Sequence, residues 1–379
     1  MASEQHRSMT TRFYRACLIF CLMILSQSTV MGQPLKAMGY LAWWMPQSWQ
    51  NLPLQEMDRL FFFELKVDSS GAIAERHGWP EQWVELQQAT QRQKTPLDLT
   101  LTLFDAETFN QLFSSDQAPN KLLAECLELA ANPYVNGLHL DFEIYGGASS
   151  KAITNYRLFL TQLSQQLHGL SPARGLSVFL PVQTESALYD APSLSLMDWV
   201  VSQSYDSHYR SSKHAGPVAP LTGSDELTWE KAAADAFALG VPRNRLILTF
   251  PLYGYEWMVL DNKPRSPTQK MGVTTTFSEV DKELLPDVQI SITQRVKQFG
   301  ATQDPSSGSS YYQFQNQQGQ HVQGWFEDWW SLSRKIDFVK AEKLGGITFF
   351  VLGYDKEQLL GYYLYQKKPK SLDDLIDRQ

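Results

Sequence analysis

The sequence that decides the fold is Asn-Gly-Leu-His-Leu-Asp-Phe-Glu, which runs from Asn136 to Glu143. Its leucines and phenylalanine alternate with His139, Asp141 and Glu143, and this period of two predicts a β-strand. Residues two apart on a strand point to the same face, so the three ionisable side chains form one polar row. Such a row fits either a strand that faces a functional site or an edge strand with a solvated, charged face.

The two carboxyl groups of this row point to acid–base chemistry. If their face is partly dry, Asp141 and Glu143 repel each other, and one of them holds its proton at neutral pH. A retained proton is what a general acid needs. The alternation by itself leaves the functional site and the edge strand equally open.

The same stretch resembles the signature of glycoside hydrolase family 18, Asp-Gly-x-Asp-x-Asp-x-Glu, at the end of the fourth strand of a TIM barrel. Gly137, Asp141 and Glu143 match this signature. Asn136 and His139 depart from it, because the family usually has Asp at both positions. The resemblance implies that Asp141 and Glu143 are catalytic residues.

The rest of the chain also predicts a (β/α)8 TIM barrel. The 379 residues are 43% hydrophobic and 19% charged, which suits one large α/β domain. Amphipathic stretches predict helices at 79–93, at 120–131 with Asn120 as the cap, and at 150–169. The eight expected strands are 37–44, 59–67, 97–104, 136–143, 175–182, 199–205, 246–252 and 346–352. A doubly wound fold is the alternative, but no Gly-rich phosphate loop follows the first strand.

The interval between the seventh and eighth strands is too long for one βα unit. It contains two strand-like runs, 288–292 and 311–314, and many aromatic and β-branched residues. We therefore expect a small folded α+β insertion rather than a disordered loop. The predicted organisation is a signal peptide at 1–32, strands one to seven at 33–255, the insertion at 256–324 and completion of the barrel at 325–379.

The first residues have the pattern of a secretory signal. Three arginines precede an apolar run at 16–25 that is too short to span a bilayer, and a cleavage site fits before Gln33. We expect a secreted or periplasmic protein with no membrane anchor after cleavage. The mature chain then keeps one cysteine, Cys126, whose leucine neighbours predict a buried thiol; it allows neither an internal disulfide nor a cysteine-based metal site.

Charge and aromatic content narrow the partners further. The net charge of -7 gives no reason to expect binding to nucleic acid or to an anionic membrane. Aromatic residues are plentiful, with 11 Trp. For Trp43, Trp44, Trp329 and Trp330 we expect packing rather than sugar contacts.

Further segments resemble the same family in chain order. Residues 201–206 are similar to its sixth-strand motif, 250–257 to its seventh-strand Pro-x-Tyr-Gly segment, and 39–44 to its first strand. Tyr205 matches a third catalytic position, whose hydroxyl bonds the substrate acetamido group. Phe350 stands where the family places the Trp that forms the floor of the sugar subsite. The residues expected to bind substrate are Tyr40, His139, Gln203, Asp206, Tyr253 and Phe350.

Two segments of the chain resemble one branch of the family in particular. The segments 205–210 and 216–221 resemble the spore-cortex and peptidoglycan N-acetylglucosaminidases. Chitinases usually have Arg where Tyr255 stands, and a Ser-x-Gly-Gly loop after strand three, where this chain has Leu-Phe-Asp-Ala at 103–106.

The resemblance implies a retaining, substrate-assisted hydrolysis of a β-linked N-acetylhexosamine glycan, such as chitin, peptidoglycan or poly-N-acetylglucosamine. Glu143 would protonate the leaving oxygen, Asp141 would hold the acetamido N–H and Tyr205 its carbonyl. No metal or organic cofactor is required, and we expect a monomer. The alternative is a glycan-binding barrel of the same family that has lost catalysis, for which His139 and Phe350 are the arguments.

His139 carries a further hypothesis. Because it neighbours Asp141 on the same face, we expect the two to hydrogen-bond. A free histidine titrates near pH ~6.5, so His139 would limit activity on the acidic side.

Overall fold

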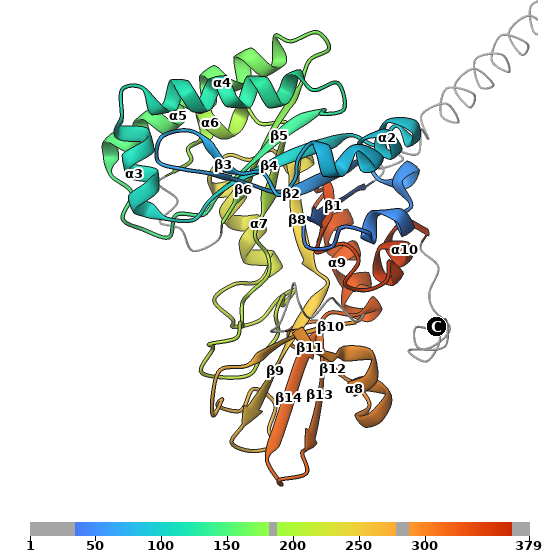
Figure 1. Ribbon diagram of the computed structural model, residues 1–379. Coiled ribbons are helices and arrows are strands. Elements are labelled where there is room, and N and C mark those ends of the chain that lie inside the picture. Colours follow the sequence, from blue (N-terminus) through green and yellow to red (C-terminus); the bar gives the residue numbers. More distant parts are fainter. Residues whose placement is uncertain (1–34, 182–187, 278–287, 366–379) are drawn as a thin grey trace, which may run out of the picture. The chain divides into compact units, whose positions relative to one another are not determined.

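A closed barrel of parallel strands forms the larger part of the computed structural model, which describes residues 35–181, 188–277 and 288–365 (Figure 1). The barrel closes because β1 pairs with both β15 and β2. Its eight strands are β1 (Lys36–Ala42), β2 (Arg59–Val67), β4 (Leu97–Leu103), β5 (Gly137–Phe142), β6 (Gly175–Leu180), β7 (Trp199–Ser202), β8 (Leu246–Pro251) and β15 (Gly346–Phe350). The predicted (β/α)8 fold is confirmed, whereas the predicted signal peptide at 1–32 lies outside the described residues.

The predicted strand ends differ from the observed ones in a regular way. The second strand has the predicted limits, but the sixth ends at Ser202 rather than at residue 205. Beyond Ser202 the backbone N–H of Gln203 still donates to the carbonyl of Leu180 at 2.9 Å, but no regular strand pairing follows. A short strand, β3 (Ile73–Glu75), pairs antiparallel with β2, and residue 182 of the predicted fifth strand lies outside the described residues.

Helices follow the barrel strands. They are α2 (Val84–Gln93), α3 (Ala106–Ser114), α4 (Ala118–Ala131), α5 (Ser150–His168), α6 (Ala191–Ser195), α7 (Trp229–Ala238), α9 (Trp329–Ala341) and α10 (Gln358–Tyr365), with 3-10 turns η1 (Ser48–Asn51), η2 (Leu54–Glu56), η3 (Glu81–Trp83) and η4 (Arg243–Arg245). The expectation that Asn120 caps its helix is wrong. The helix begins earlier, because Pro119 fits its first turn, where no backbone N–H donor is needed. Cys126 on α4 is buried and free, as predicted.

Strand β5 packs its apolar residues outward against helices and turns its polar row to the barrel interior. Phe142 contacts the ring of Tyr156 on α5 at 5.6 Å between centroids and lies 6.3 Å from Phe113 on α3. Ser149 begins α5, since its hydroxyl accepts a hydrogen bond from the backbone of Ala152. This outer packing leaves the even-numbered residues of β5 in the helical layer and the polar row inside.

The first residues of the family-like stretch are structural. A side chain at Gly137 would place Cβ 2.8 Å from both the Asp98 carboxylate and the carbonyl of Gly175, so only glycine fits between these strands. The side-chain oxygen of Asn136 accepts a hydrogen bond from the backbone of Leu97 at 3.0 Å. A neutral amide oxygen fulfils this role, which explains why Asn can stand where Asp is usual.

The insertion between the seventh and eighth barrel strands is a six-stranded sheet with one helix. It consists of β9 (Tyr253–Val259), β10 (Val273–Thr276), β11 (Val288–Ser291), α8 (Ile292–Phe299), β12 (Thr302–Asp304), β13 (Ser309–Gln315) and β14 (His321–Phe326). The strand order is β11-β10-β9-β14-β13-β12. The folded α+β insertion is therefore confirmed, and its first strand begins as early as Tyr253.

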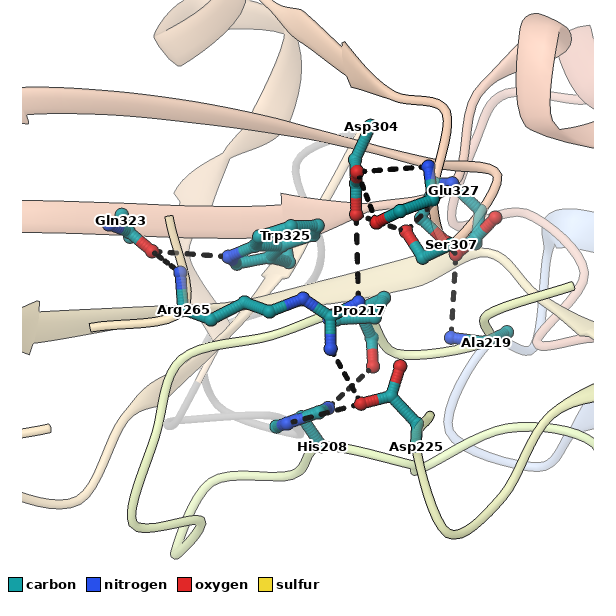
Figure 2. A network of polar contacts seen from close by, with 12 residues as sticks. His208, Pro217, Ala219, Asp225, Arg265, Asp304, Ser307, Gln323, Trp325 and Glu327 are labelled. Carbon is teal, nitrogen blue, oxygen red and sulfur yellow. Dashed lines mark hydrogen bonds and ion pairs between the residues drawn. The ribbon is translucent and has the colours of Figure 1, made fainter. Parts of the chain in front are cut away.

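A polar network connects the insertion with the long loop after β7 (Figure 2). Arg265 binds Asp225 at 2.6 Å and lies 3.5 Å from Asp304. Nδ1 of His208 donates to the carbonyl of Pro217, and Nε2 lies 4.0 Å from the same Asp225. Through Asp225, these contacts join His208, near the start of the loop, to Arg265 of the insertion.

Candidate active site

The catalytic pair predicted from the sequence lies at the C-terminal end of β5, where TIM barrels carry their active sites. Asp141 is 4% exposed and Glu143 is half-buried. Among the described residues, no donor bonds Oδ1 of Asp141, and neither carboxyl forms an ion pair. Burial raises the pKa of Asp141, and the charges of Glu143 and Glu64 raise it further. The pair therefore retains a proton at pH values at which free carboxylates are ionised.

Glu143 is the more accessible carboxyl of the two. Burial raises its pKa, the hydroxyl of Tyr145 opposes this effect by donating a hydrogen bond to Oε2, and the charge of Asp206 adds to the increase. The same hydroxyl lies 3.3 Å from the side-chain oxygen of Gln203. Tyr145 thus brings Gln203 next to Glu143, and the role of Gln203 in substrate binding stays a prediction. Tyr145 was missed because nothing in its sequence context distinguishes it from a loop tyrosine.

The structure contradicts the prediction that His139 binds substrate and hydrogen-bonds Asp141. His139 is fully buried, and its ring nitrogens lie 2.8 Å from the hydroxyl of Tyr40 and 2.8 Å from that of Ser177. Burial lowers the pKa of His139 to about 3, and the charge of Arg59 contributes. The ring is therefore neutral at any working pH, and it supports the site from inside the barrel.

Tyr40 is likewise a supporting residue rather than the predicted substrate contact. Its side chain is 1% exposed. Its hydroxyl is hydrogen-bonded to His139, and its ring packs against neighbouring rings, including Phe350 at 5.5 Å. Position on the first strand was predicted correctly, but depth in the barrel was not. The alternation of side chains along a strand specifies which face a residue occupies. It does not specify how far that residue lies from the barrel mouth.

Aromatic rings form one wall of the mouth. Tyr205 stacks on Phe350, with centroids 5.8 Å apart and planes 11° from parallel, and Tyr253 stands edge-on to Tyr205 at 6.3 Å. Phe350 is half-buried and Tyr205 is 9% exposed. The predicted residues Tyr205, Tyr253 and Phe350 are thus brought together with Glu143 and Asp141, although they come from the loop after β7, from β9 and from β15.

Asp206 adds a third carboxyl at the mouth. The hydroxyls of Tyr253 and Tyr255 both donate to its Oδ1, at 2.7 and 3.1 Å. Burial raises the pKa of Asp206 to about 6, although both tyrosines oppose the increase. The sequence distinguished Tyr255 only as a departure from the chitinase pattern. In the structure it donates a hydrogen bond to Asp206 and favours the ionised form of that carboxyl.

Glu64 is a site residue that the sequence analysis missed. It lies on β2, is 6% exposed and accepts a 2.8 Å hydrogen bond from Thr102, a neighbour of Asp141 in the sheet register. Its charge contributes to the raised pKa of Asp141. The sequence did offer one signal for Glu64: it is a lone glutamate within the apolar run of residues 60–65. A strand with only a structural role has no need of a charged residue there.

No cluster of His, Cys, Asp and Glu that could hold a metal ion occurs in residues 35–181, 188–277 and 288–365. Over the same residues, none of the helices has the length and apolar character needed to cross a membrane.

Comparison with known proteins identifies the family. The model of "Glycosyl hydrolases family 18" matches residues 36–355, which is most of the chain. The chain belongs to glycosyl hydrolase family 18. This membership confirms the resemblance noted in the sequence and places the chain among the glycosidases.

Relatives of this family 18 chain include bacterial spore proteins. It is 26% identical over 295 residues to a protein of Bacillus subtilis (strain 168) named "Putative sporulation-specific glycosylase YdhD", with 75% of this chain and 63% of that protein covered. It is 21% identical over 281 residues to the cortical fragment-lytic enzyme of the same organism, with 71% and 59% covered. The chain therefore spans less than two thirds of the length of these two relatives.

Solved structures agree with the fold. A GH18 chitinase from Cycas revoluta in complex with (GlcNAc)3 matches with a TM-score of 0.71 at 16% identity, covering 87% of this chain and 98% of that one. The spore cortex-lytic enzyme SleL of Bacillus megaterium QM B1551 matches with a TM-score of 0.66 at 17% identity, covering 90% and 73%. Identities this low establish the shared barrel and do not extend to substrate.

Proposed function

We propose that this family 18 chain is a secreted hydrolase of β-linked N-acetylhexosamine glycans that retains the anomeric configuration by substrate assistance. The observation that carries the proposal is the pair of buried carboxyls at the barrel mouth, Asp141 and Glu143, with no basic partner among the described residues. Buried carboxyls without cations keep a proton available, which is the requirement for a general acid.

In the proposed reaction each residue has a distinct role. Glu143 is the accessible carboxyl and protonates the departing glycosidic oxygen. The substrate acetamido oxygen then attacks the anomeric carbon, as the family mechanism requires, and Asp141 holds the acetamido N–H. The hydroxyl of Tyr205, whose ring stacks on Phe350, binds the acetamido carbonyl in this proposal. Water opens the oxazolinium ion, with ionised Glu143 as the base.

Candidate substrates come from the relatives and from the sequence. Cortical fragment-lytic enzymes and a GH18 chitinase with a bound N-acetylglucosamine oligomer point to peptidoglycan and chitin oligomers. Poly-N-acetylglucosamine is a third candidate, because it too consists of β-linked N-acetylhexosamine units. Delivery outside the cytoplasm rests on the signal-like residues 1–32. The substrate is therefore expected in the periplasm or the medium, and the enzyme is expected to act as a monomer.

A catalytically impaired glycan-binding barrel is the second candidate. Its strongest sequence argument was His139 in place of Asp. Because His139 is buried and bonded to Tyr40 and Ser177, it leaves the carboxyl pair itself unobstructed. Phe350, which stands where the family usually has Trp, still favours the impaired glycan-binding barrel, since Phe offers a sugar less stacking area.

A substrate panel separates the two candidates. The full chain is incubated with N-acetylated peptidoglycan, chitin oligomers and the same oligomers after deacetylation, and the products are sized by mass spectrometry. We expect cleavage of acetylated substrate only, with the β-anomer appearing first by NMR. Binding without cleavage would favour the impaired barrel, and equal cleavage of deacetylated substrate would exclude substrate assistance.

A further inference from the structure

Strand β2 contains a bulge close to the carboxyl pair. In its register with β4, Phe62 pairs with Leu99. Leu65, the third residue after Phe62, pairs with Leu101, the second residue after Leu99. β2 therefore has one extra residue over this interval, which includes Glu64. A bulge of this kind changes the direction of a side chain and is frequent beside active sites.

The bulge turns the side chain of Glu64 into the barrel. Phe62 packs outward, with its ring 4.8 Å from that of Trp83, and in a regular strand Glu64 would point the same way. Instead Glu64 is 6% exposed and accepts a hydrogen bond from Thr102 at 2.8 Å. Thr102 pairs with Asp141 in the register of β4 and β5, so these two side chains share the interior face. The Glu64 carboxylate is thus held beside Asp141 by a residue of the strand between them.

Asp141 has a carboxyl group on two sides. Glu143 follows it on β5, and Glu64 approaches from β2. Oδ1 of Asp141 is buried without a hydrogen-bond partner in the described part of the chain. His139, the preceding inward residue of β5, is neutral because burial lowers its pKa to about 3. Each of these features disfavours a further negative charge on Asp141.

The other titratable groups that face Asp141 are phenols. Burial raises the pKa of each of them, so none is charged at working pH. Asp206, from the loop after β7, acts on Glu143. The phenols belong to Tyr40 of β1, Tyr145 of the loop after β5, Tyr156 of α5, Tyr189 of the segment before α6 and Tyr205 of the loop after β7.

The charge of Glu64 is not neutralised by its own neighbours. Among the described residues Glu64 forms no ion pair, and Lys66, the next residue but one on β2, binds Glu75 at 3.0 Å. Burial lowers the pKa of His77, although the charge of Glu64 opposes this decrease, so the ring is uncharged at neutral pH. The Glu64 carboxylate therefore acts on Asp141 without a compensating cation.

We propose that Glu64 is a positioning residue: turned inward by the bulge and held by Thr102, its carboxylate keeps a proton on the Asp141–Glu143 pair until substrate binds. The inference rests on the proposed function, in which this pair supplies the general acid. Glu143 then gives the proton to the departing glycosidic oxygen, which leaves the pair ionised, and regains one from the attacking water. Glu64 itself contacts neither the substrate nor the transferred proton.

Glu64→Gln tests this role in the full chain. The amide is nearly isosteric and its oxygen can still accept the hydrogen bond from Thr102, so the substitution removes the charge alone. Without that charge the pair loses its proton at lower pH, and the alkaline limb of kcat/KM on a soluble N-acetylglucosamine oligomer should move down by about 1 pH unit. NMR titration of the Asp141 carboxyl carbon, without substrate, should show a displacement in the same direction.

Two further variants control for charge and for position. Glu75→Gln makes the same substitution at an exposed residue of β3 and is expected to titrate like the parent. Glu64→Asp keeps the charge on a shorter side chain and is expected to displace the alkaline limb less than Glu64→Gln does. Melting temperatures confirm that each variant is folded.

The outcomes distinguish this role from the proposed function. If the Asp141 titration and the alkaline limb stay in place in folded Glu64→Gln, the role of Glu64 is overturned, while hydrolysis by the parent leaves the proposed function standing. Equal displacements in Glu64→Asp and Glu64→Gln would assign the effect to packing and overturn it as well. If the parent hydrolyses no N-acetylated glycan, the proposed function fails, and the role of Glu64 in it fails too. A downward displacement specific to Glu64→Gln supports the proposal.

Discussion

The molecule contains two kinds of buried carboxyl groups, and they differ in their partners. Around the insertion two of them meet a cation: Glu327 binds Lys335 at 2.7 Å, with both side chains fully buried, and Glu256 binds Arg295 at 2.8 Å. At the barrel mouth, Asp141 and Glu143 meet no cation among the described residues and face each other. Burying a charge is costly unless it is paired.

This difference separates structure from chemistry. A cation beside a buried carboxylate favours its ionised form: burial raises the pKa of Glu327, and Lys335 opposes that increase. Removing the cation would leave an uncompensated buried charge. An unpaired carboxyl resists ionisation and keeps a proton available for transfer. The same residue type is thus structural in the insertion and suited to catalysis in the barrel, and the neighbouring side chains decide which.

The largest effect is expected from Glu143→Gln. The amide is nearly isosteric but cannot donate the proton, so hydrolysis should fall by about 10²–10⁴-fold or more, since general acid catalysis contributes that much. Binding and melting temperature should remain close to those of the parent, because no ion pair is broken. Turnover is measured on a soluble N-acetylglucosamine oligomer, and retained activity would remove Glu143 from the mechanism.

Breaking a paired carboxyl should affect stability instead. Lys335→Met leaves Glu327 buried without its cation and is expected to cost about 3–5 kcal/mol of unfolding free energy, as for other broken buried pairs. The double variant Glu327→Leu/Lys335→Met removes both charges and should recover most of that loss. Denaturant unfolding measures all three proteins; equal stability of the single and double variants would contradict the assigned role of the pair.

Asp206 is intermediate between the carboxyls that are paired with a cation and those that are unpaired, because it is bound by tyrosine hydroxyls and not by a cation. Its pKa is raised to about 6, so at neutral pH it is ionised and its charge raises the pKa of Glu143. Asp206→Asn removes this charge, Glu143 then loses its proton at lower pH, and the alkaline limb of kcat/KM should move down by about 0.5–1 pH unit. A limb that stays in place or moves upward would show that the two carboxyls are not coupled.

The smallest effect is expected on the acid limb from His139→Gln. With its pKa lowered to about 3, His139 has no proton to gain in the working range, contrary to the expectation that it limits activity at acidic pH. Gln offers a donor and an acceptor towards Tyr40 and Ser177, so kcat can change while the acid limb of kcat/KM does not. Profiles from pH ~4 to ~8 for both proteins check this, and a displaced acid limb would restore a titrating role for His139.

The sequence by itself determined the barrel and the carboxyl pair. The period-two pattern of residues 136–143 placed His139, Asp141 and Glu143 on one face, and the alternation of apolar runs placed eight strands in order. The residues Tyr205, Tyr253 and Phe350 were found through motifs, because each occurs in a segment with its own signature. Local patterns of this kind survive folding unchanged.

Only the tertiary structure decided how deep each side chain lies in the barrel and which residues it contacts. His139 and Asp141 share a face, yet two residues along the strand separate an interior position bonded to Ser177 from a carboxyl at the mouth. Glu64 and Tyr145 reach the site from different segments, and no spacing in the sequence records that closure of the barrel brings them there. The pKa values depend on burial and on neighbouring charges, which are properties of the packed barrel and not of any one stretch of chain.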